Sequence, residues 1–181
     1  MAKKLEDLVH GAKRSYKDVQ IVLDGTLGAQ REKLKNAVAE TQRAKSNRLT
    51  GAAPAAAQKA AQQALEAFDA EHADEIATVR VYSCAGATEW ISIRLANPAN
   101  PGDDKRFQAL GYHPYNAAIE VIIRHATQVL DADEEHKPSG EFWKLYFEEL
   151  VQPGDMEALA SAVMEVNGVP TGQAFADRKK A

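Results

Sequence analysis

Two apolar segments, 19–23 and 79–83, lie at equal distances on either side of Gly51. Apolar and polar residues alternate in both, which is typical of half-buried strands. The mirror pairs are Val19 with Ser83, Ile21 with Val81, and Leu23 with Val79. We expect the order strand, helix, turn, helix, strand, with the second strand returning antiparallel to the first. This arrangement leaves few other folds open to residues 18–84.

The stretch between these strands predicts two long helices, 27–49 and 55–72, separated by a Gly- and Pro-bearing turn. The apolar seam of the first helix is narrow and recurs as in a two-helix coiled coil. Alanine dominates the seam of the second, and alanine buries little area, so at about 25 cal/mol per Å² the hairpin is marginal alone. We expect its larger apolar side chains to contact a partner or a second copy of the chain. These candidates are Leu34, Val38, Leu65 and Phe68.

The remainder of the sequence predicts a compact set of helices. The segments are 86–95 (for which a short strand also fits), 115–130, 141–150 and 156–166, the last capped by Asp155. A long loop, 97–113, in which residues 105–110 could form one helical turn, and an acidic linker, 131–138, separate them. The predicted fold is therefore α+β and predominantly α. Its divisions are an N-terminal polar segment 1–17, a strand–helix–helix–strand hairpin unit 18–84, a small helical bundle 85–167, and a flexible tail 168–181.

Charge and cysteine content narrow the functional classes. The formal net charge of −4 argues against a nucleic-acid-binding protein, which usually carries a basic face. Cys84 is the single cysteine, so an intramolecular disulfide is impossible and a cytosolic location is expected. No run approaches the roughly 18 apolar residues of a membrane span, and the N-terminus lacks an apolar signal region. We therefore expect neither nucleic acid nor membrane as a partner.

The strand end at Val22-Leu23-Asp24-Gly25-Thr26 looks like the Asp-x-Asp-Gly-Thr motif of haloacid dehalogenase-type phosphatases. That chemistry uses the first aspartate as nucleophile, and here the position holds Val22, whose side chain cannot attack phosphorus. A strand-end turn in which Thr26 caps the next helix is the favoured interpretation. A degenerate phosphatase-like enzyme stays a remote alternative that rests on Asp24.

The remaining polar residues give no catalytic or metal-binding pattern. The histidines are not spaced as metal-ligand pairs, and the acidic stretch 131–136 lacks the mid-loop glycine of a calcium loop. Cys84 has no base adjacent in sequence, so a buried structural thiol is favoured over a nucleophile. The sequence thus predicts no enzyme, no cofactor and no metal.

Two aromatic groups could be core or partner contacts, and the sequence leaves both possibilities open. Tyr112 and Tyr115 flank His113-Pro114 at a predicted helix entry. Trp143 and Phe147 lie in the aromatic helix 141–150, whose rings point to more than one helix face. Exposed aromatic anchors often dominate binding at protein interfaces.

The order of these landmarks resembles tail assembly chaperones of long-tailed phages that infect actinobacteria. The similarity covers about residues 18–168. It rests on the strand ending Leu23-Asp24-Gly25, the segment bearing Trp90, the Pro-rich Asp loop 97–104, the Gly111-Tyr112 step, and the Trp143 helix. The sequence departs from the family at two places. The asparagine that usually follows soon after the aromatic residue at Tyr112 is found only at Asn116, after His113-Pro114-Tyr115. The strand 79–83 also continues into Gly86 without the basic residues expected at the start of the next helix.

The resemblance implies a non-enzymatic protein that binds the tape measure protein and assists polymerisation of tail-tube subunits around it. It also implies action in the host cytoplasm during infection, absence from the mature virion, and self-association as a homo-oligomer. A structural virion protein of the tail or connector is the competing hypothesis.

Overall fold

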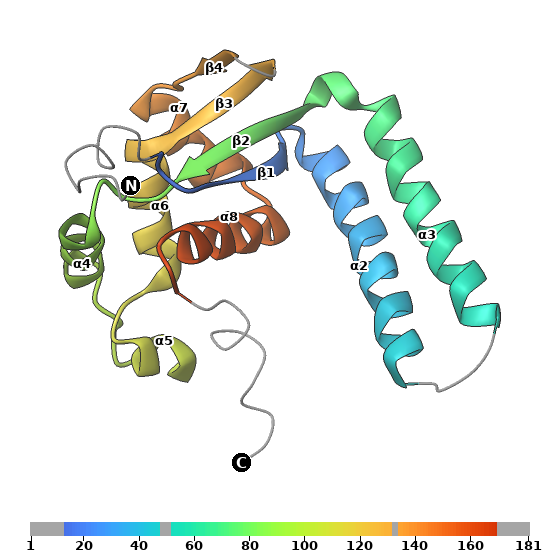
Figure 1. Ribbon diagram of the computed structural model, residues 1–181, viewed down its shortest axis with the longest axis horizontal. Coiled ribbons are helices and arrows are strands. Elements are labelled where there is room, and N and C mark those ends of the chain that lie inside the picture. Colours follow the sequence, from blue (N-terminus) through green and yellow to red (C-terminus); the bar gives the residue numbers. More distant parts are fainter. Residues whose placement is uncertain (1–12, 48–51, 132–133, 170–181) are drawn as a thin grey trace, which may run out of the picture. The chain divides into compact units, whose positions relative to one another are not determined.

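The computed structural model describes residues 13–47, 52–131 and 134–169 (Figure 1). The fold is α+β and mostly helical, as the sequence predicts. Four strands form one antiparallel sheet in the order β1-β2-β3-β4. Their bounds are β1 Tyr16–Val22, β2 Ile76–Tyr82, β3 Ala126–Asp131 and β4 Glu134–His136. None of the helices in the described ranges is both long and apolar enough to cross a membrane.

Helices make up most of the remaining described chain. Two long helices, α2 Gly25–Asn47 and α3 Ala52–Glu71, pack against each other, and η1 Ala73–Glu75 leads from α3 into β2. The shorter helices are α4 Ala87–Ala96, α5 Lys105–Leu110, α6 Pro114–His125, α7 Gly140–Leu145, the π-helix η2 Tyr146–Leu150, and α8 Pro153–Val166. The turn predicted at Gly51, the first residues of the polar segment 1–17, and most of the tail 168–181 lie outside the described residues.

The chain divides into two compact units, each assembled from segments far apart in the sequence. The sheet unit comprises the described parts of Met1–Val19, Val79–Ser139 and Glu157–Ala181, and the hairpin unit comprises those of Gln20–Thr78 and Gly140–Met156. These units differ from the contiguous divisions 18–84 and 85–167 predicted from the sequence. Periodicity along one segment carries no information about which distant segment packs on it.

The predicted helix 115–130 is wrong in its second half. Helix α6 ends at His125, where the N–H of Ala126 donates to the Ile122 carbonyl, and the chain continues as β3. Strand β3 pairs antiparallel with β4, with Val129 opposite Glu135. Strand β4 lies inside the segment 131–138, which the sequence predicts to be an acidic linker. Thr127 and Val129 are β-branched and suit a strand. The sequence of this segment fits both a helix and a strand, and pairing with neighbouring strands selects the strand. Residues 85–167 are therefore not purely helical.

The first strand also ends earlier than its alternation predicts. Strand β1 stops at Val22, which is buried, whereas Leu23 lies beyond the strand and is 38% exposed. The predicted strand 19–23, with Leu23 facing inward opposite Val79, is wrong at this end. Ile21 and Val81, the other apolar mirror pair, are both buried.

The sheet unit has a well-formed apolar core. Helices α6 and α8 contribute alanines and branched side chains that are almost wholly buried, together with strand residue Val81 and α4 residue Ile93. Those from α6 and α8 are Ala117, Ala118, Val121, Ile122, Leu159, Ala160, Ala162 and Val163. Small and branched residues alternate here, so the helices approach closely and still bury a large apolar area.

A polar network on the sheet unit links residues of all four strands. Arg80 of β2 forms a two-pronged ion pair with Asp18 of β1, at 2.8 and 2.9 Å, and a third bond of 2.8 Å to Glu135 of β4. The hydroxyls of Tyr82 and Thr127 each donate to Glu135 at 2.7 Å. The Thr127 and Tyr82 hydrogen bonds lower the pKa of the Glu135 carboxyl, and Arg80 adds to this effect. Glu135 thus ties the three-residue edge strand to its neighbours.

Candidate functional site

Helices α2 and α3 pack against each other, as the sequence predicts, and carry the four candidate residues of the seam. Leu34 and Val38 lie on α2, and Leu65 and Phe68 lie on α3. Val38 is buried, at 8% exposed, whereas the other three side chains are only half-buried. The apolar seam is thus incompletely covered by the chain itself.

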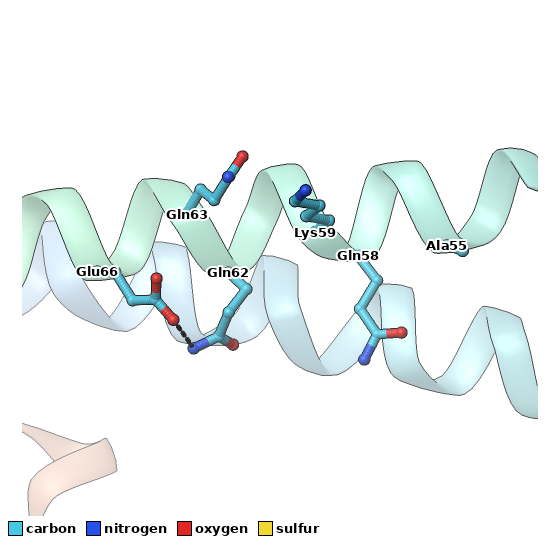
Figure 2. A pocket seen from close by; sticks show the side chains of 6 residues that line it. All are labelled: Ala55, Gln58, Lys59, Gln62, Gln63 and Glu66. Atoms are coloured by element: carbon cyan, nitrogen blue, oxygen red, sulfur yellow. Dashed lines mark hydrogen bonds between the residues drawn. The ribbon is translucent and has the colours of Figure 1, made fainter.

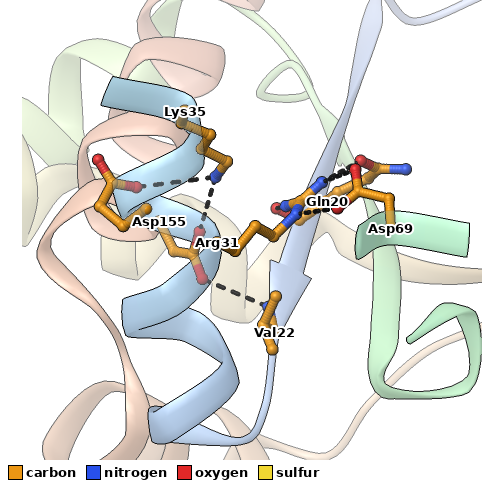
Figure 3. Close-up of polar contacts among 7 residues, drawn as sticks. Gln20, Val22, Arg31, Lys35, Asp69 and Asp155 are labelled. Carbon is orange, nitrogen blue, oxygen red and sulfur yellow. Dashed lines mark hydrogen bonds and ion pairs between the residues drawn. The ribbon is translucent and has the colours of Figure 1, made fainter. Parts of the chain in front are cut away.

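An ion pair within the seam joins the two helices where they approach the strands. The Arg31 guanidinium donates to both carboxylate oxygens of Asp69, at 2.7 and 2.8 Å, and to Gln20 Oε1 at 2.5 Å (Figure 3). Arg31 is 4% exposed although it is charged. Such a pair fixes the register of α2 against α3, because a buried charge without its partner is costly. The sequence alone does not identify Asp69 as the partner of Arg31.

Asp155 has a different role from the helix cap that the sequence predicts. Helix α8 begins at Pro153, so Asp155 lies inside its first turn and is 3% exposed. Its carboxylate accepts a hydrogen bond from the backbone N–H of Val22 at 3.3 Å and lies 3.3 Å from Lys35 Nζ (Figure 3). Asp155 therefore connects β1, α2 and α8 within the hairpin unit.

Asp24 acts as the cap of α2. Its Oδ1 accepts hydrogen bonds from the backbone N–H groups of Thr26 and Leu27, at 2.8 and 2.9 Å. The predicted cap, Thr26, is itself inside the helix, which begins at Gly25. An aspartate that satisfies the first N–H groups of a helix is a common structural element. This engagement accounts for the Asp-Gly-Thr sequence without phosphatase chemistry.

The four aromatic candidates are divided between the two units. Tyr112 and Tyr115 belong to the sheet unit, and Trp143 and Phe147 belong to the hairpin unit. Tyr112 and Trp143 are 4% and 0% exposed, so they are core residues and do not serve as exposed anchors in this structure. Tyr115 and Phe147 are half-buried.

Tyr112 packs in a small aromatic cluster of the sheet unit. Its ring meets that of Trp90 edge to face, with the centroids 5.9 Å apart, and the Arg94 guanidinium lies 5.6 Å from both centroids. Burial raises the pKa of the Tyr112 hydroxyl. The nearby helix entry is stabilised by His113, whose Nδ1 accepts from the N–H of Asn116 at 3.3 Å. The Tyr-His-Pro-Tyr segment is thus built as a packed helix start.

Sequence reasoning missed an exposed apolar pair on α4. Ile91 is 46% exposed and Leu95 is 76% exposed, whereas Trp90 and Ile93 on the same helix are buried. The i, i+4 spacing of Ile91 and Leu95 places them on one helix face. The alternation Ile91, Ile93, Leu95 fits a strand and conceals this face in the sequence.

A pocket of about 450 Å³ lies along α3 (Figure 2). All of its lining residues come from this one helix: Ala55, Gln58, Lys59, Gln62, Gln63 and Glu66. Gln62 donates to Glu66 at 3.1 Å. Ligand pockets of enzymes are usually enclosed and lined by several elements. An amide-rich surface on one helix is better suited to contact with another polypeptide.

The fold brings together three chemically reactive side chains that the sequence keeps apart. One donor atom each of Cys84, Glu89 and His125 lie within 4.8 Å of one another in the sheet unit. His125 Nε2 is 2.8 Å from Glu89 Oε1, and Arg124 Nη1 is 3.7 Å from the same oxygen. Burial raises the pKa of the Cys84 thiol to about 11, with a smaller contribution from the Glu89 charge. A neutral thiol is a poor nucleophile, which agrees with the interpretation of Cys84 as a structural cysteine.

Comparison with known proteins finds no relative of this chain. No protein-family model matches the chain, and no curated protein or solved structure is significantly similar to it. The function of this protein is therefore inferred from its residues and their arrangement, together with the order of landmarks along the sequence.

Proposed function

We propose that this protein is a phage tail assembly chaperone, which binds the tape measure protein and assists polymerisation of the tail tube without catalysing a reaction. The observation that carries the proposal is the half-covered seam of the hairpin unit. Leu34, Leu65 and Phe68 are each only half-buried on two helices of 23 and 20 residues. At about 1.5 Å per residue, these helices offer a binding surface about 30 Å long.

The chemistry of this surface favours a helical partner. An amphipathic helix can place apolar residues, spaced three and four apart, against the seam. Around the seam, α3 exposes alanines and glutamines, including Ala60, Gln62 and Gln63. Alanine allows a partner's backbone to approach closely, and glutamine supplies hydrogen bonds at the rim. A long helical tape measure protein is a partner of this kind, and the family resemblance supports the same choice.

The remaining parts of the proposal follow from the same resemblance. The protein acts in the host cytoplasm during infection, interacts with the tail-tube protein as it polymerises, and forms homo-oligomers. The seam supports self-association as well, because a second copy of the hairpin can cover it.

Co-expression with a phage tape measure protein tests the proposal. We expect a soluble complex that co-purifies, and a tape measure protein that is insoluble when expressed alone. The double variant Leu34→Ser/Leu65→Ser should weaken the complex at least tenfold, because it removes apolar contact area from both sides of the seam. Leu130→Ser, at an exposed apolar position of β3 in the sheet unit, is the matched control and should retain binding.

Two outcomes would contradict the proposal. One is a tape measure protein whose solubility is unchanged by co-expression. The other is binding that the seam variant leaves intact while circular dichroism shows a folded protein. Mass spectrometry of purified virions tests the competing hypothesis, since a structural tail or connector protein is retained in the particle and a chaperone is not.

A further inference from the structure

The trio of Cys84, Glu89 and His125 is unrelated to the hairpin seam and has no part in the proposed chaperone function. Cys84 follows β2, Glu89 lies in the first turn of α4, and His125 is the last residue of α6. Three elements of the sheet unit thus converge on one point. Their sulfur, oxygen and nitrogen donors lie within 4.8 Å of one another.

These separations are close to what a tetrahedral metal ion requires. Zinc binds thiolate sulfur at about 2.3 Å and imidazole nitrogen or carboxylate oxygen at about 2.0–2.1 Å. Donors at these bond lengths lie about 3.3–3.8 Å apart around a tetrahedron. A shift of about 1 Å in side chains that have free torsions brings the three donors into this range. The hydrogen bond between Glu89 and His125 is then lost, and both side chains bind the metal ion instead.

We propose that Cys84, Glu89 and His125 form a binding site for a divalent transition-metal ion of the zinc class. Calcium and magnesium prefer shells made wholly of oxygen, so a site with sulfur and nitrogen donors discriminates against them. Thiolate and imidazole together favour zinc and its close neighbours in the first transition row. On coordination the Cys84 thiol becomes a thiolate, and its proton passes to the solvent.

Backbone and outer contacts hold two of the three ligands in place. The backbone N–H of Cys84 donates to Asn167 Oδ1 at 2.9 Å, and Asn167 Nδ2 donates to the Val163 carbonyl at 2.8 Å. Glu89 Oε2 accepts from the Ala85 N–H at 2.7 Å, which leaves Oε1 on the side of His125. Metal sites in proteins characteristically orient their ligands through such outer contacts.

The surroundings of the trio also suit a bound cation. Cys84 is buried, at 7% exposed, whereas the Glu89 side chain is 24% exposed. The trio is therefore shielded from solvent at the sulfur and accessible to solvent at Glu89. Two arginines act on the trio: Arg124 lies 3.7 Å from Glu89 Oε1 and also pairs with Glu120, and the charge of Arg14 acts on Cys84. When a metal binds, Arg124 can keep its pairing with Glu120. Three protein ligands leave the fourth position for water.

A titration of the metal-free, full-length protein with Co²⁺ tests the site directly. Cobalt substitutes for zinc, and a cobalt–thiolate bond gives a charge-transfer band in the near ultraviolet. We expect this band to saturate at one equivalent and to disappear when Zn²⁺ is added. Cys84→Ser should abolish the band. Glu89→Gln and His125→Ala should each weaken binding by more than the roughly 10–100-fold that loss of an outer-shell partner costs. His136→Ala, which removes an exposed histidine of β4, is the matched control and should bind normally.

A second readout does not depend on the sulfur. Zinc that binds the folded state should raise the melting temperature, because a ligand that binds only the native protein stabilises it by mass action. The increase should be lost in Glu89→Gln, whose amide oxygen can still accept from the Ala85 N–H, and circular dichroism checks that this variant is folded. The proposal is overturned if the native protein gives no charge-transfer band. It is also overturned if His125→Ala leaves the band and affinity unchanged, since Cys84 alone then captures the metal, or if zinc stabilises Glu89→Gln as much as the native protein.

Discussion

Alanine has opposite roles in the two units of this protein. On α3 of the hairpin unit, Ala56, Ala60 and Ala67 are exposed. On α6 of the sheet unit, Ala117 and Ala118 are fully buried. The same residue type therefore produces an open surface in one place and a close helix contact in the other. The difference lies in the accompanying residues, because branched side chains such as Val121 and Ile122 fill the space beside the alanines only on α6.

This contrast separates two ways of holding helices together. The sheet unit depends on apolar packing, whereas the contact between α2 and α3 depends on Val38, a few half-buried apolar side chains and the ion pair of Arg31 with Asp69. Because α2 and α3 share so little apolar contact, replacing contacts between them by contacts with a partner costs little free energy. Four substitution experiments can break or sharpen this contrast.

The largest difference should appear on removing a large apolar side chain from each unit. Ile122→Ala should lower the free energy of unfolding by about 2–5 kcal/mol, because it leaves a cavity in a closed core. Leu65→Ala, at a half-buried position, should cost about 1 kcal/mol. Urea unfolding followed by circular dichroism measures both values. Equal losses would mean that the seam is packed as tightly as the core.

Removing the charge of the seam should have the next largest effect. Arg31→Ala should cost about 1.5–3 kcal/mol, because the carboxylate of Asp69 loses its charged hydrogen-bond donor. The double variant Arg31→Met/Asp69→Leu should recover most of this loss, since an apolar pair can replace a buried ion pair. Urea unfolding of the three proteins checks the prediction. A double variant as unstable as Arg31→Ala would show that the two residues act separately.

Enlarging one alanine in each unit compares the two roles directly. Ala118→Leu should destabilise the protein by about 1–3 kcal/mol, because the core beside α6 has no room for the added atoms. Ala60→Leu, on the exposed side of α3, should change the free energy of unfolding by less than about 0.5 kcal/mol. Melting temperatures of both variants suffice as the measurement. A large loss with Ala60→Leu would place α3 in a covered environment.

The smallest effect should be the pH dependence that comes from Glu135. Its pKa is lower in the folded than in the unfolded protein, so its contribution is present above the unfolded pKa and is lost as the pH falls through the folded pKa. We expect this contribution to be at most about 1 kcal/mol at neutral pH, since the site is near the surface. Glu135→Gln should lower the stability near pH 7 and flatten its decline below about pH 4.5. Unchanged pH curves would contradict a role for Glu135 in joining the strands.

The hairpin was predictable because its signals are local. Alternation over residues 19–23 and 79–83 and the seven-residue seam through Leu34 lie within short windows of sequence, although the cap of α2 is Asp24 and not the predicted Thr26. Residues 126–131 were not predictable in this way. Ala126 and Val129 fit a continued helix as well as a strand, and only pairing with β2 and β4 selects the strand. The partner of Arg31 is likewise 38 residues away and is identified only in the fold.

The candidate metal site illustrates the same limit for chemistry. Glu89 is five residues after Cys84, a spacing typical of no metal motif, and His125 is 36 residues further along the chain. The ends of β2 and α6 and the start of α4 have to converge before these side chains can share a ligand. Motif spacing detects sites built on one turn or hairpin, and it misses a site whose ligands come from three separate elements.

Strand β4 has a consequence for how this protein behaves at high concentration. It forms one edge of the sheet, is only three residues long, and consists of Glu134, Glu135 and His136, all exposed. An edge this short offers another chain few backbone groups to pair with, and its two acidic residues repel an identical edge. Growth of the sheet from copy to copy is therefore blocked at β4.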